Sequence, residues 1–440
     1  MKKLFILFLL FSAAHIRSVA QVNAAKLDQL FETYDTHQKA MLSMCLSENK
    51  RVVYHKSIGY GDVGKQVKAN EQTLYHIGSI SKMFTAVMIL QLIDEKKLSL
   101  TTKLDSFFTG IPNSDKITMS MMLNHRSGIH NFTDDSEYAS YMEKPMKQEE
   151  LLAIFEKQTS DFEPDSTASY SNTNYVLLSF IIEKITGNYY DIELQTRICE
   201  IAGLINTKVG TNLGGEAVSY EFAEGKWNPA TVTDMSVPRG AGAIVSTPSD
   251  LCLFIEALFS GKLISATSFY EMKSIRDHYG LGIFAVPFNG KKGYGHTGGI
   301  DGFQSVLVYF PDDKLALCIL GNGWNSVMND LSIGVLSIYF KQEYTIPSFE
   351  KKSVGAEASK TLEGVYANGA IGMKITITNT DGKLSAQATG QSAFPLDKVS
   401  ELEYKFDAAN IKLTFFKDKD GDIPSLKLLQ GGMNLSFEKE

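Results

Sequence analysis

The sequence predicts an α/β (α+β) fold, in which an antiparallel sheet is flanked by helices and joined to a helical lobe, followed by a small C-terminal β domain. Three observations lead to this prediction. Strand-like patterns lie toward both ends of residues 25–343, the stretch between them is mainly helical, and residues 361–440 contain short strands separated by turn residues. The sheet is therefore expected to draw strands from both ends of the first unit.

The first twenty residues have the pattern of a secretory signal peptide. Lys2 and Lys3 precede the apolar run Leu4–Ala14, and Ser18-Val19-Ala20 places small residues at the two positions that a signal peptidase reads. The apolar run is too short to cross a bilayer, although a retained N-terminal anchor is the alternative interpretation. We expect residues 1–20 to be removed, which would leave a secreted or periplasmic protein without a stable membrane span.

The charge of the chain argues against polyanionic partners. The formal net charge is −7, and removal of the three basic residues of the signal leaves 40 basic and 50 acidic residues, a net charge of −10. An acidic protein is repelled by nucleic acid and by anionic membrane surfaces. The expected partner is a small-molecule ester or peptide substrate, and no nucleic acid is expected.

The four cysteines are widely spaced and lie in apolar surroundings. They are Cys45, Cys199, Cys252 and Cys318. None has the CxxC spacing of a metal or redox site, so each is predicted to be a small buried hydrophobe. The alternative is a disulfide between two of these cysteines, which an oxidising compartment would permit.

The elements of the first unit follow from the hydrophobic pattern. An amphipathic helix comes first, then a hairpin that turns at Glu48-Asn49-Lys50, then a long apolar helix that should be buried nearly all round. The expected ranges are Ala25–Gln38 for the first helix, Ala40–Val63 for the hairpin, Ser79–Lys97 for the buried helix, 100–235 for the mainly helical lobe, and Gln304–Phe310 and Leu315–Leu320 for the returning strands.

Beyond the first unit, the polar stretch 344–360 is predicted to be a linker, and residues 361–440 a β sandwich or partial barrel. Asp381-Gly382 is a hairpin turn signal, because glycine tolerates positive φ. The run Asp418–Asp422 resembles the start of a calcium loop, but Leu429 stands where the twelfth ligand would be, so no calcium site is predicted.

The first motif with chemistry is Ser79-x-x-Lys82, at the start of the apolar helix. Residues three apart share one face of a helix, so the lysine amine can reach the serine hydroxyl. A lysine in apolar surroundings has a lowered pKa and can take the serine proton. The helix N-terminus also favours developing negative charge. The alternative is a helix start with an ordinary surface lysine.

The second motif is Tyr170-Ser171-Asn172, which precedes a helix that runs to about Lys184. A phenol near a lysine can be held as phenolate or can shuttle a proton to a leaving group. An Asn side chain both donates and accepts, which suits an ester or amide substrate. The alternative is that Asn172 caps the helix and Tyr170 packs.

The third motif is His296-Thr297-Gly298-Gly299, expected to precede a strand that starts near Phe303. The glycines would let a substrate lie against an edge strand, and the Gly299 N–H could pair with the Ser79 N–H as an oxyanion hole. A phosphate loop requires a helix after the glycines, whereas a strand follows here. A plain hairpin turn is the alternative.

These three motifs, in this order, resemble those of the serine β-lactamase and penicillin-binding protein superfamily, and most of all the class C β-lactamase-related group. The resemblance extends over most of residues 25–340. LNHRSGIHNF (Leu123–Phe132), RGAGAIVSTPSDL (Arg239–Leu251) and Tyr279-Gly-Leu-Gly282 are similar to further segments of that family. A β-lactamase/transpeptidase-like fold is the implied architecture.

The resemblance implies a role for each motif residue. Ser79 would be the acylated nucleophile, Lys82 its proton acceptor, and Tyr170 the general acid/base. The implied substrate-binding residues are Asn172, His296, Thr297 and Gly298, and the N–H groups of Ser79 and Gly299 would form the oxyanion hole. No metal or other cofactor is implied, and His125 and His130 are not spaced as a helical metal pair.

Two positions depart from the family pattern. His296 replaces a lysine, and a histidine with an ordinary pKa of about 6.5 is mostly neutral at pH 7, which disfavours recognition of a substrate carboxylate. Asp165 stands where many relatives have glycine before the Tyr170 motif, which would alter the loop without touching the chemistry.

The implied activity is that of a secreted serine hydrolase that forms an acyl-serine on a small ester or a D-amino acid-containing peptide, with weak or no β-lactamase activity. Esterases, D-aminopeptidases and DD-carboxypeptidases are of this kind, and peptidoglycan fragments are a further candidate substrate. The alternative is a non-catalytic penicillin-binding or peptidoglycan-sensing protein that is acylated without turnover.

Overall fold

A computed structural model describes most of the chain: residues 22–211, 215–349, 360–369, 372–380, 383–389, 393–406, 411–430 and 433–440. The expected signal peptide, the expected turn at Asp381-Gly382 and most of the expected linker lie outside these residues. Within them, no helix combines the length and the apolar composition that a membrane crossing requires.

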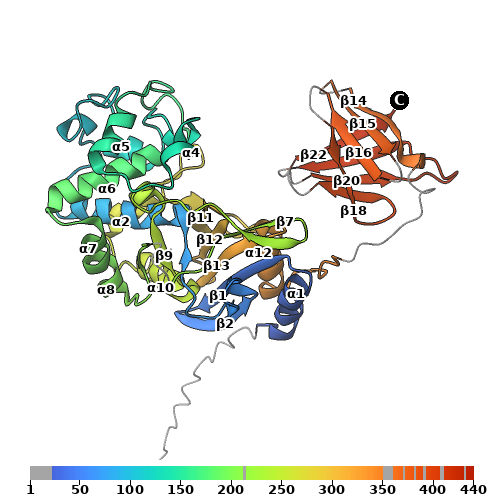
Figure 1. The fold of residues 1–440 in the computed structure, drawn as a ribbon, viewed down its shortest axis with the longest axis horizontal. Coiled ribbons are helices and arrows are strands. Elements are labelled where there is room, and N and C mark those ends of the chain that lie inside the picture. Colours follow the sequence, from blue (N-terminus) through green and yellow to red (C-terminus); the bar gives the residue numbers. More distant parts are fainter. Residues whose placement is uncertain are drawn as a thin grey trace, which may run out of the picture.

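The main sheet of the first unit draws its central strands from both ends of that unit (Figure 1). Its order is β10-β11-β12-β13-β1-β2, and the hairpin β7-β8 joins it through a parallel contact with β13. The strands are β1 (Ala40–Glu48), β2 (Arg51–Ile58), β7 (Tyr220–Ala223), β8 (Lys226–Pro229), β10 (Phe284–Ala285), β11 (Tyr294–Ile300), β12 (Phe303–Phe310) and β13 (Leu315–Trp324). Strands β1 and β13 pair antiparallel, with Ala40 opposite Trp324, which confirms the predicted construction of the sheet.

Helices cover the sheet and form the lobe between its two halves. The α-helices are α1 (Ala24–Thr36), α2 (Ser81–Asp94), α3 (Met119–Leu123), α4 (Tyr138–Tyr141), α5 (Gln148–Phe155), α6 (Asn172–Thr186), α7 (Tyr190–Leu194), α8 (Glu200–Ala202), α9 (Arg239–Gly242), α10 (Pro248–Phe259), α11 (Ala266–Met272) and α12 (Met328–Tyr339). Short 3-10 turns, η1 (Gly78–Ile80) and η3 (Phe132–Asp134), lie beside the site described below. Helices are the main regular structure of the expected lobe, residues 100–235, as predicted, but loops connect them and strands β6 (Lys208–Val209), β7 and β8 also fall inside it.

Side chains of the central strands alternate between two apolar cores. In β13, Leu317 and Ile319 pack with α1 and α12, whereas Cys318 and Leu320 face the core that contains α2, α6 and α10. A strand that is covered on both faces has no solvent side, so its sequence is apolar throughout rather than alternating. This explains why β13 is buried from Leu315 to Gly323.

All four cysteines are buried free thiols, as the apolar surroundings predicted. Cys45 lies opposite Cys318 in the β1-β13 register, and Cys252 approaches the same pair from α10. Burial raises the pKa of the Cys252 and Cys318 thiols well above the ordinary value. These residues therefore act as packing groups in the core.

The C-terminal unit is one antiparallel sheet with its own apolar core. Its order is β17-β16-β15-β14-β22-β21-β20-β19-β18. The strands are β14 (Gly364–Asn368), β15 (Met373–Thr380), β16 (Lys383–Ala388), β17 (Phe394–Pro395), β18 (Asp397–Lys398), β19 (Glu403–Phe406), β20 (Ile411–Phe416), β21 (Ser425–Gln430) and β22 (Met433–Lys439). The two end strands, β17 and β18, are separated by Leu396 alone, so the sheet curls until its ends meet. This confirms the barrel-like form of the expected β domain.

The first residues of the expected linker belong to the first unit. Tyr344, Ile346 and Phe349 pack against the core between the sheet and helices α1 and α12. The Phe349 ring contacts the edge of Tyr34 with ring centroids 5.1 Å apart.

Candidate functional site

Ser79 lies in the 3-10 turn η1, directly before α2. Gly78 in this turn has a φ of +50°, and a Cβ there would come within 2.8 Å of the Gly299 nitrogen. A glycine is therefore needed for the backbone conformation and for the close approach of β11. The turn presents Ser79 at the junction between the sheet and the helical lobe.

Lys82 is fully buried one helical turn after Ser79. Its Nζ lies 3.0 Å from Ser79 Oγ, 2.7 Å from Asn172 Oδ1 and 2.8 Å from the Ala241 carbonyl oxygen. Burial holds the pKa of Lys82 well below its ordinary value. The alternative of a surface lysine is therefore wrong.

The three neighbours of Lys82 suit a neutral amine. A neutral amine has two N–H donors and one lone pair, and the oxygens of Asn172 and Ala241 can only accept. Ser79 Oγ is the one neighbour of the three that can donate a proton. The lone pair of the amine is thus left for the Ser79 hydroxyl, which is the arrangement that a general base requires.

Asn172 is the first residue of α6 and is held by the loop before η3. Its backbone N–H donates to Asn131 Oδ1 at 2.9 Å, and its Nδ2 donates to Thr133 Oγ1 at 3.0 Å. The helix cap is Ser171, so the interpretation of Asn172 as a cap is wrong. Because Thr133 takes the amide nitrogen, the amide oxygen points to Lys82.

Tyr170 lies between Ser79 and a cluster of aromatic rings. Its ring centroid is 4.8 Å from Lys82 Nζ and 4.4 Å from the His125 ring. Burial raises the pKa of Tyr170, and the hydrogen bond with Ser79 opposes this rise without cancelling it. A protonated phenol fits the proton-shuttle interpretation better than the phenolate.

His125 supports the Tyr170 motif, and sequence reasoning assigned it no role. Its Nδ1 accepts the Ser171 N–H at 3.1 Å, and its carbonyl oxygen accepts the Ser169 N–H at 2.9 Å. Burial is the largest cause that lowers the pKa of His125 well below its ordinary value. Its place in the LNHRSG segment was the available signal.

The third motif is itself a strand, so the alternative of a plain hairpin turn is wrong, and the next strand begins at Phe303 as expected. His296, Thr297, Gly298 and Gly299 all lie in β11 and pair with β12. A Cβ on Gly298 would come within 2.1 Å of the Ile77 carbonyl oxygen and 3.0 Å of the Ser79 nitrogen. Glycine at position 298 therefore lets β11 pass directly over the Ser79 turn.

His296 is buried and uncharged. Its ring stacks on Phe284 with centroids 4.1 Å apart, and its Nδ1 lies against the Thr297 carbonyl oxygen. Burial and, next, the charge of Lys82 lower the pKa of His296 to about 3. The residue brings no positive charge to the site at neutral pH.

A cavity of about 430 Å³ opens beside Ser79. The residues around it are Ser79, Tyr170, His278, Tyr279, Phe284, Ala285, His296, Thr297, Gly298 and Gly299. The structure thus brings all three motifs together, with Lys82 and Asn172 behind Ser79. Sequence reasoning did not assign His278 or Phe284 to the site. His76 lies in a buried pair with Glu216 at 2.9 Å.

Asp165 keeps the backbone conformation that a glycine would give. Its φ is +66°, in the left-handed region that glycine adopts freely and that Asp tolerates. Its carboxylate accepts from Arg126 Nε at 2.6 Å and from Arg276 Nη1 at 2.8 Å. These contacts lower the pKa of Asp165, with the Arg126 hydrogen bond as the largest cause. Asp165 therefore adopts a conformation open to glycine and adds ion pairs with Arg126 and Arg276.

Comparisons with known proteins agree with this geometry. A family model described as Beta-lactamase matches residues 27–335. Penicillin-binding protein 4* of Bacillus subtilis (strain 168) is 25% identical over 426 residues, which cover 90% of this chain and 94% of that protein.

Two solved structures share the fold. The D-amino acid amidase from Ochrobactrum anthropi SV3, complexed with L-phenylalanine amide, has a TM-score of 0.63 and 25% identity over 72% of this chain and 99% of that chain. The octameric penicillin-binding protein homologue from Pyrococcus abyssi has a TM-score of 0.68 and 22% identity, over 94% of this chain and 100% of that chain. The latter match extends into the C-terminal β unit.

Proposed function

Because the chain belongs to the Beta-lactamase family, whose members include serine hydrolases, we propose that it is an acyl-transferring hydrolase with Ser79 as its nucleophile. The observation that carries this proposal is the buried Lys82 amine, which lies 3.0 Å from Ser79 Oγ with its other two contacts on obligate acceptors.

The proposed reaction has two steps. Ser79 Oγ attacks the carbonyl carbon of the substrate while Lys82 takes its proton, and the tetrahedral oxyanion is held by the N–H groups of Ser79 and Gly299. Collapse breaks the bond to the leaving group, which receives a proton from Tyr170. The proton on Lys82 then passes to Tyr170, which restores both groups. Water attacks the acyl-serine as Lys82 takes its proton, and Ser79 Oγ leaves with the proton of Tyr170 as the acid is released.

The proposed substrate is a small ester or a D-amino acid-containing peptide or amide without a carboxylate beside the scissile bond. The neutral His296 offers no cationic partner for a carboxylate. Tyr279 and Phe284 instead present aromatic surface to the cavity, which favours an apolar group. The D-amino acid amidase in the comparison supports the choice of D-configured substrates. Peptidoglycan fragments are the macromolecular form of such a substrate.

We also propose that the protein is exported. The support is the signal-like pattern of residues 1–20, since Lys2 and Lys3 precede the short apolar run Leu4–Ala14. The proposed hydrolase would then act outside the cytoplasm, where cell-wall peptides and their derivatives are accessible.

The test is to incubate the protein with p-nitrophenyl acetate and, separately, with a fluorescent penicillin. We expect steady release of p-nitrophenol, lost by about 10³-fold or more in Ser79→Ala. Product release and the intact mass of the protein are the measurements. A permanent mass adduct without turnover would instead support a penicillin-binding sensor. Turnover that is unchanged in Ser79→Ala would overturn the assignment of the nucleophile.

Substrate charge is tested at His296. His296→Lys should raise nitrocefin turnover at pH 7 by about ten-fold, because a charged donor to a carboxylate is worth about 1.5–3 kcal/mol. His296→Gln is the neutral control and should give no gain. The absence of a gain in His296→Lys would count against the account of substrate choice while leaving the Ser79 chemistry intact.

A further inference from the structure

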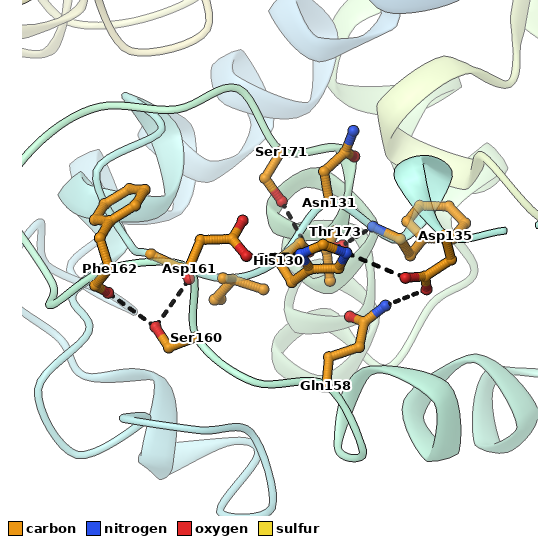
Figure 2. Close-up of polar contacts among 12 residues, drawn as sticks. His130, Asn131, Asp135, Gln158, Ser160, Asp161, Phe162, Ser171 and Thr173 are labelled. Atoms are coloured by element: carbon orange, nitrogen blue, oxygen red, sulfur yellow. Dashed lines mark hydrogen bonds and ion pairs between the residues drawn. The ribbon is translucent and has the colours of Figure 1, made fainter.

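Outside the cavity, His130 lies between two carboxylates (Figure 2). Its Nδ1 is 2.7 Å from Asp161 Oδ1, and its Nε2 is 3.1 Å from Asp135 Oδ1. Gln158 Nε2 donates to the other Asp135 oxygen at 2.6 Å and so fixes that carboxylate. Both ring nitrogens of His130 therefore face groups that accept hydrogen bonds.

This arrangement fits the charged form of the ring. A neutral imidazole has one N–H, whereas an imidazolium has two and can donate to both carboxylates. Partial burial disfavours the charge, but the hydrogen bonds and charges of Asp161 and then Asp135 outweigh it and raise the pKa of His130. Across the described residues, no group of three His, Cys, Asp or Glu side chains is arranged to hold a metal ion, so this cluster is an ion-pair cluster.

Residues 130–133, which include His130, form hydrogen bonds with the first turn of α6. The His130 carbonyl oxygen accepts from Thr173 Oγ1 at 2.6 Å and from Ser171 Oγ at 3.3 Å (Figure 2). The Phe132 N–H donates to Thr173 Oγ1 at 3.1 Å. With the contacts of Asn131 and Thr133 to Asn172, each of residues 130–133 touches residues 171–173.

The loop that carries Asp161 also contacts the chain just before residues 130–133, through the backbone of Gly128. There Gly128 accepts at its carbonyl oxygen from the Asp161 N–H and from Ser160 Oγ, both at 2.9 Å. A Cβ on Gly128 would come within 2.1 Å of the Phe162 carbonyl oxygen, so the two loops are in direct contact. The ion pairs of His130 with Asp161 and Asp135 therefore add to the backbone contacts that hold this part of the chain against the Asp161 loop.

We propose that His130 is a positioning residue for the Ser79 site. Its imidazolium, held by Asp135 and Asp161, fixes residues 130–133 against the first turn of α6 and thereby presents Asn172 Oδ1 to Lys82. This inference rests on the proposed function, since it assumes that Lys82 activates Ser79. His130 itself touches no reacting atom.

The positioning depends on pH in a defined direction. The charged groups that face His130 are Asp135 and Asp161. Because folding raises the pKa of His130, its two ion pairs are fully formed below the ordinary pKa of histidine. These ion pairs are lost as the pH rises through the raised pKa of His130.

The test measures how fast a fluorophosphonate probe labels Ser79, by intact mass, over a series of pH values. In His130→Gln we expect the maximal labelling rate to be about ten-fold lower than in the wild-type protein, because Asn172 is misplaced. The probe concentration that gives half the maximal rate should stay within about two-fold of the wild-type value, because the probe still binds. The wild-type rate should fall on the alkaline side. That fall should move to lower pH in Asp161→Asn, which removes one charge, and should be absent in His130→Gln.

The matched control is His55→Gln. His55 pairs with Glu71 at 3.5 Å from strand β2, away from the cavity, and its loss should leave the labelling rate and pH profile unchanged. If His130→Gln fails to fold, Asp161→Asn and Asp135→Asn carry the test. Labelling of His130→Gln with the wild-type rate and pH profile would overturn this inference alone. Failure of the probe to label Ser79 in the wild-type protein would overturn the proposed function instead.

Discussion

The two walls that flank Ser79 are built in different ways. The wall from the helical lobe consists of side chains, since Asn172, Thr133 and His130 are linked by hydrogen bonds and ion pairs. The wall from the sheet is largely backbone, because Gly298 and Gly299 bring β11 directly against the Ser79 turn. The lobe wall should therefore respond to charge and pH, and the sheet wall to added volume.

The largest effect is expected where both walls meet, at Lys82. Lys82→Met keeps most of the volume but removes the base, and the oxygens of Asn172 and Ala241 lose their buried donor. Labelling of Ser79 should fall by about 10³-fold or more, as measured by intact mass. Lys184→Met, an exposed lysine of α6, is the control and should label normally. Normal labelling of Lys82→Met would rule out its role as the base.

The sheet wall is tested by adding one methyl group. Gly298→Ala would place a Cβ 2.1 Å from the Ile77 carbonyl oxygen, so the strand must shift at a cost of about 1–3 kcal/mol. Labelling should fall by about 10²-fold, because the Ser79 turn moves with the strand. In Gly299→Ala the nearest atom is the Phe303 carbonyl oxygen at 3.9 Å, so the melting temperature should be unchanged. Equal melting temperatures in the two variants would contradict the volume-sensitive wall.

The lobe wall is tested at a single hydroxyl. Thr133→Val keeps the shape of the side chain but removes the acceptor of Asn172 Nδ2, so the amide can turn its nitrogen toward Lys82. Labelling of Ser79 should fall by about ten-fold while the melting temperature changes little. Thr101→Val, at an exposed position, is the matched control. A wild-type rate in Thr133→Val would show that Asn172 needs no such support.

The smallest effect is expected at Asp165. Asp165→Gly retains the left-handed backbone and removes a half-exposed carboxylate from Arg126 and Arg276. The buried Arg126 keeps its contacts with Asp277 and with the backbone carbonyl oxygen of residue 165, so stability should change by about 1 kcal/mol. Asp165→Ala should destabilise the protein more, because alanine is strained at positive φ. Urea unfolding of the two variants measures the difference, and the reverse order would contradict the conformational explanation.

The sequence predicted those features that depend on local spacing. The three-residue interval from Ser79 to Lys82 places both side chains on one side of the helix start. The patterns of Ala40–Val63 and Leu315–Leu320 predicted the central strands. The proposed role of His130 could not be predicted from the sequence, because Asp135 and Asp161 lie in separate loops and contact His130 only through tertiary packing. His125 was missed for a similar reason, since its φ of +60° turns it toward Ser171.

The third motif shows a different limit of sequence reasoning. Five glycines from Gly293 to Gly302 left a plain hairpin turn as the alternative interpretation, because glycine is depleted in strands in general. Here the neighbours of Gly298 leave no room for a side chain, so tertiary contact overrides propensity. The β7-β8 hairpin was not predicted, because its residues lie within the range 100–235, which was expected to be mainly helical.

The pairing of β1 with β13 also constrains how the chain acquires its structure. The central sheet cannot close until the strand near residue 320 has been synthesised, although its partner near residue 45 is among the first residues made. Contacts between such distant segments form slowly, because a very long loop must be closed before they add stability. The central sheet of a nascent chain would thus close late in synthesis, which is compatible with the proposed export of the chain before this sheet forms.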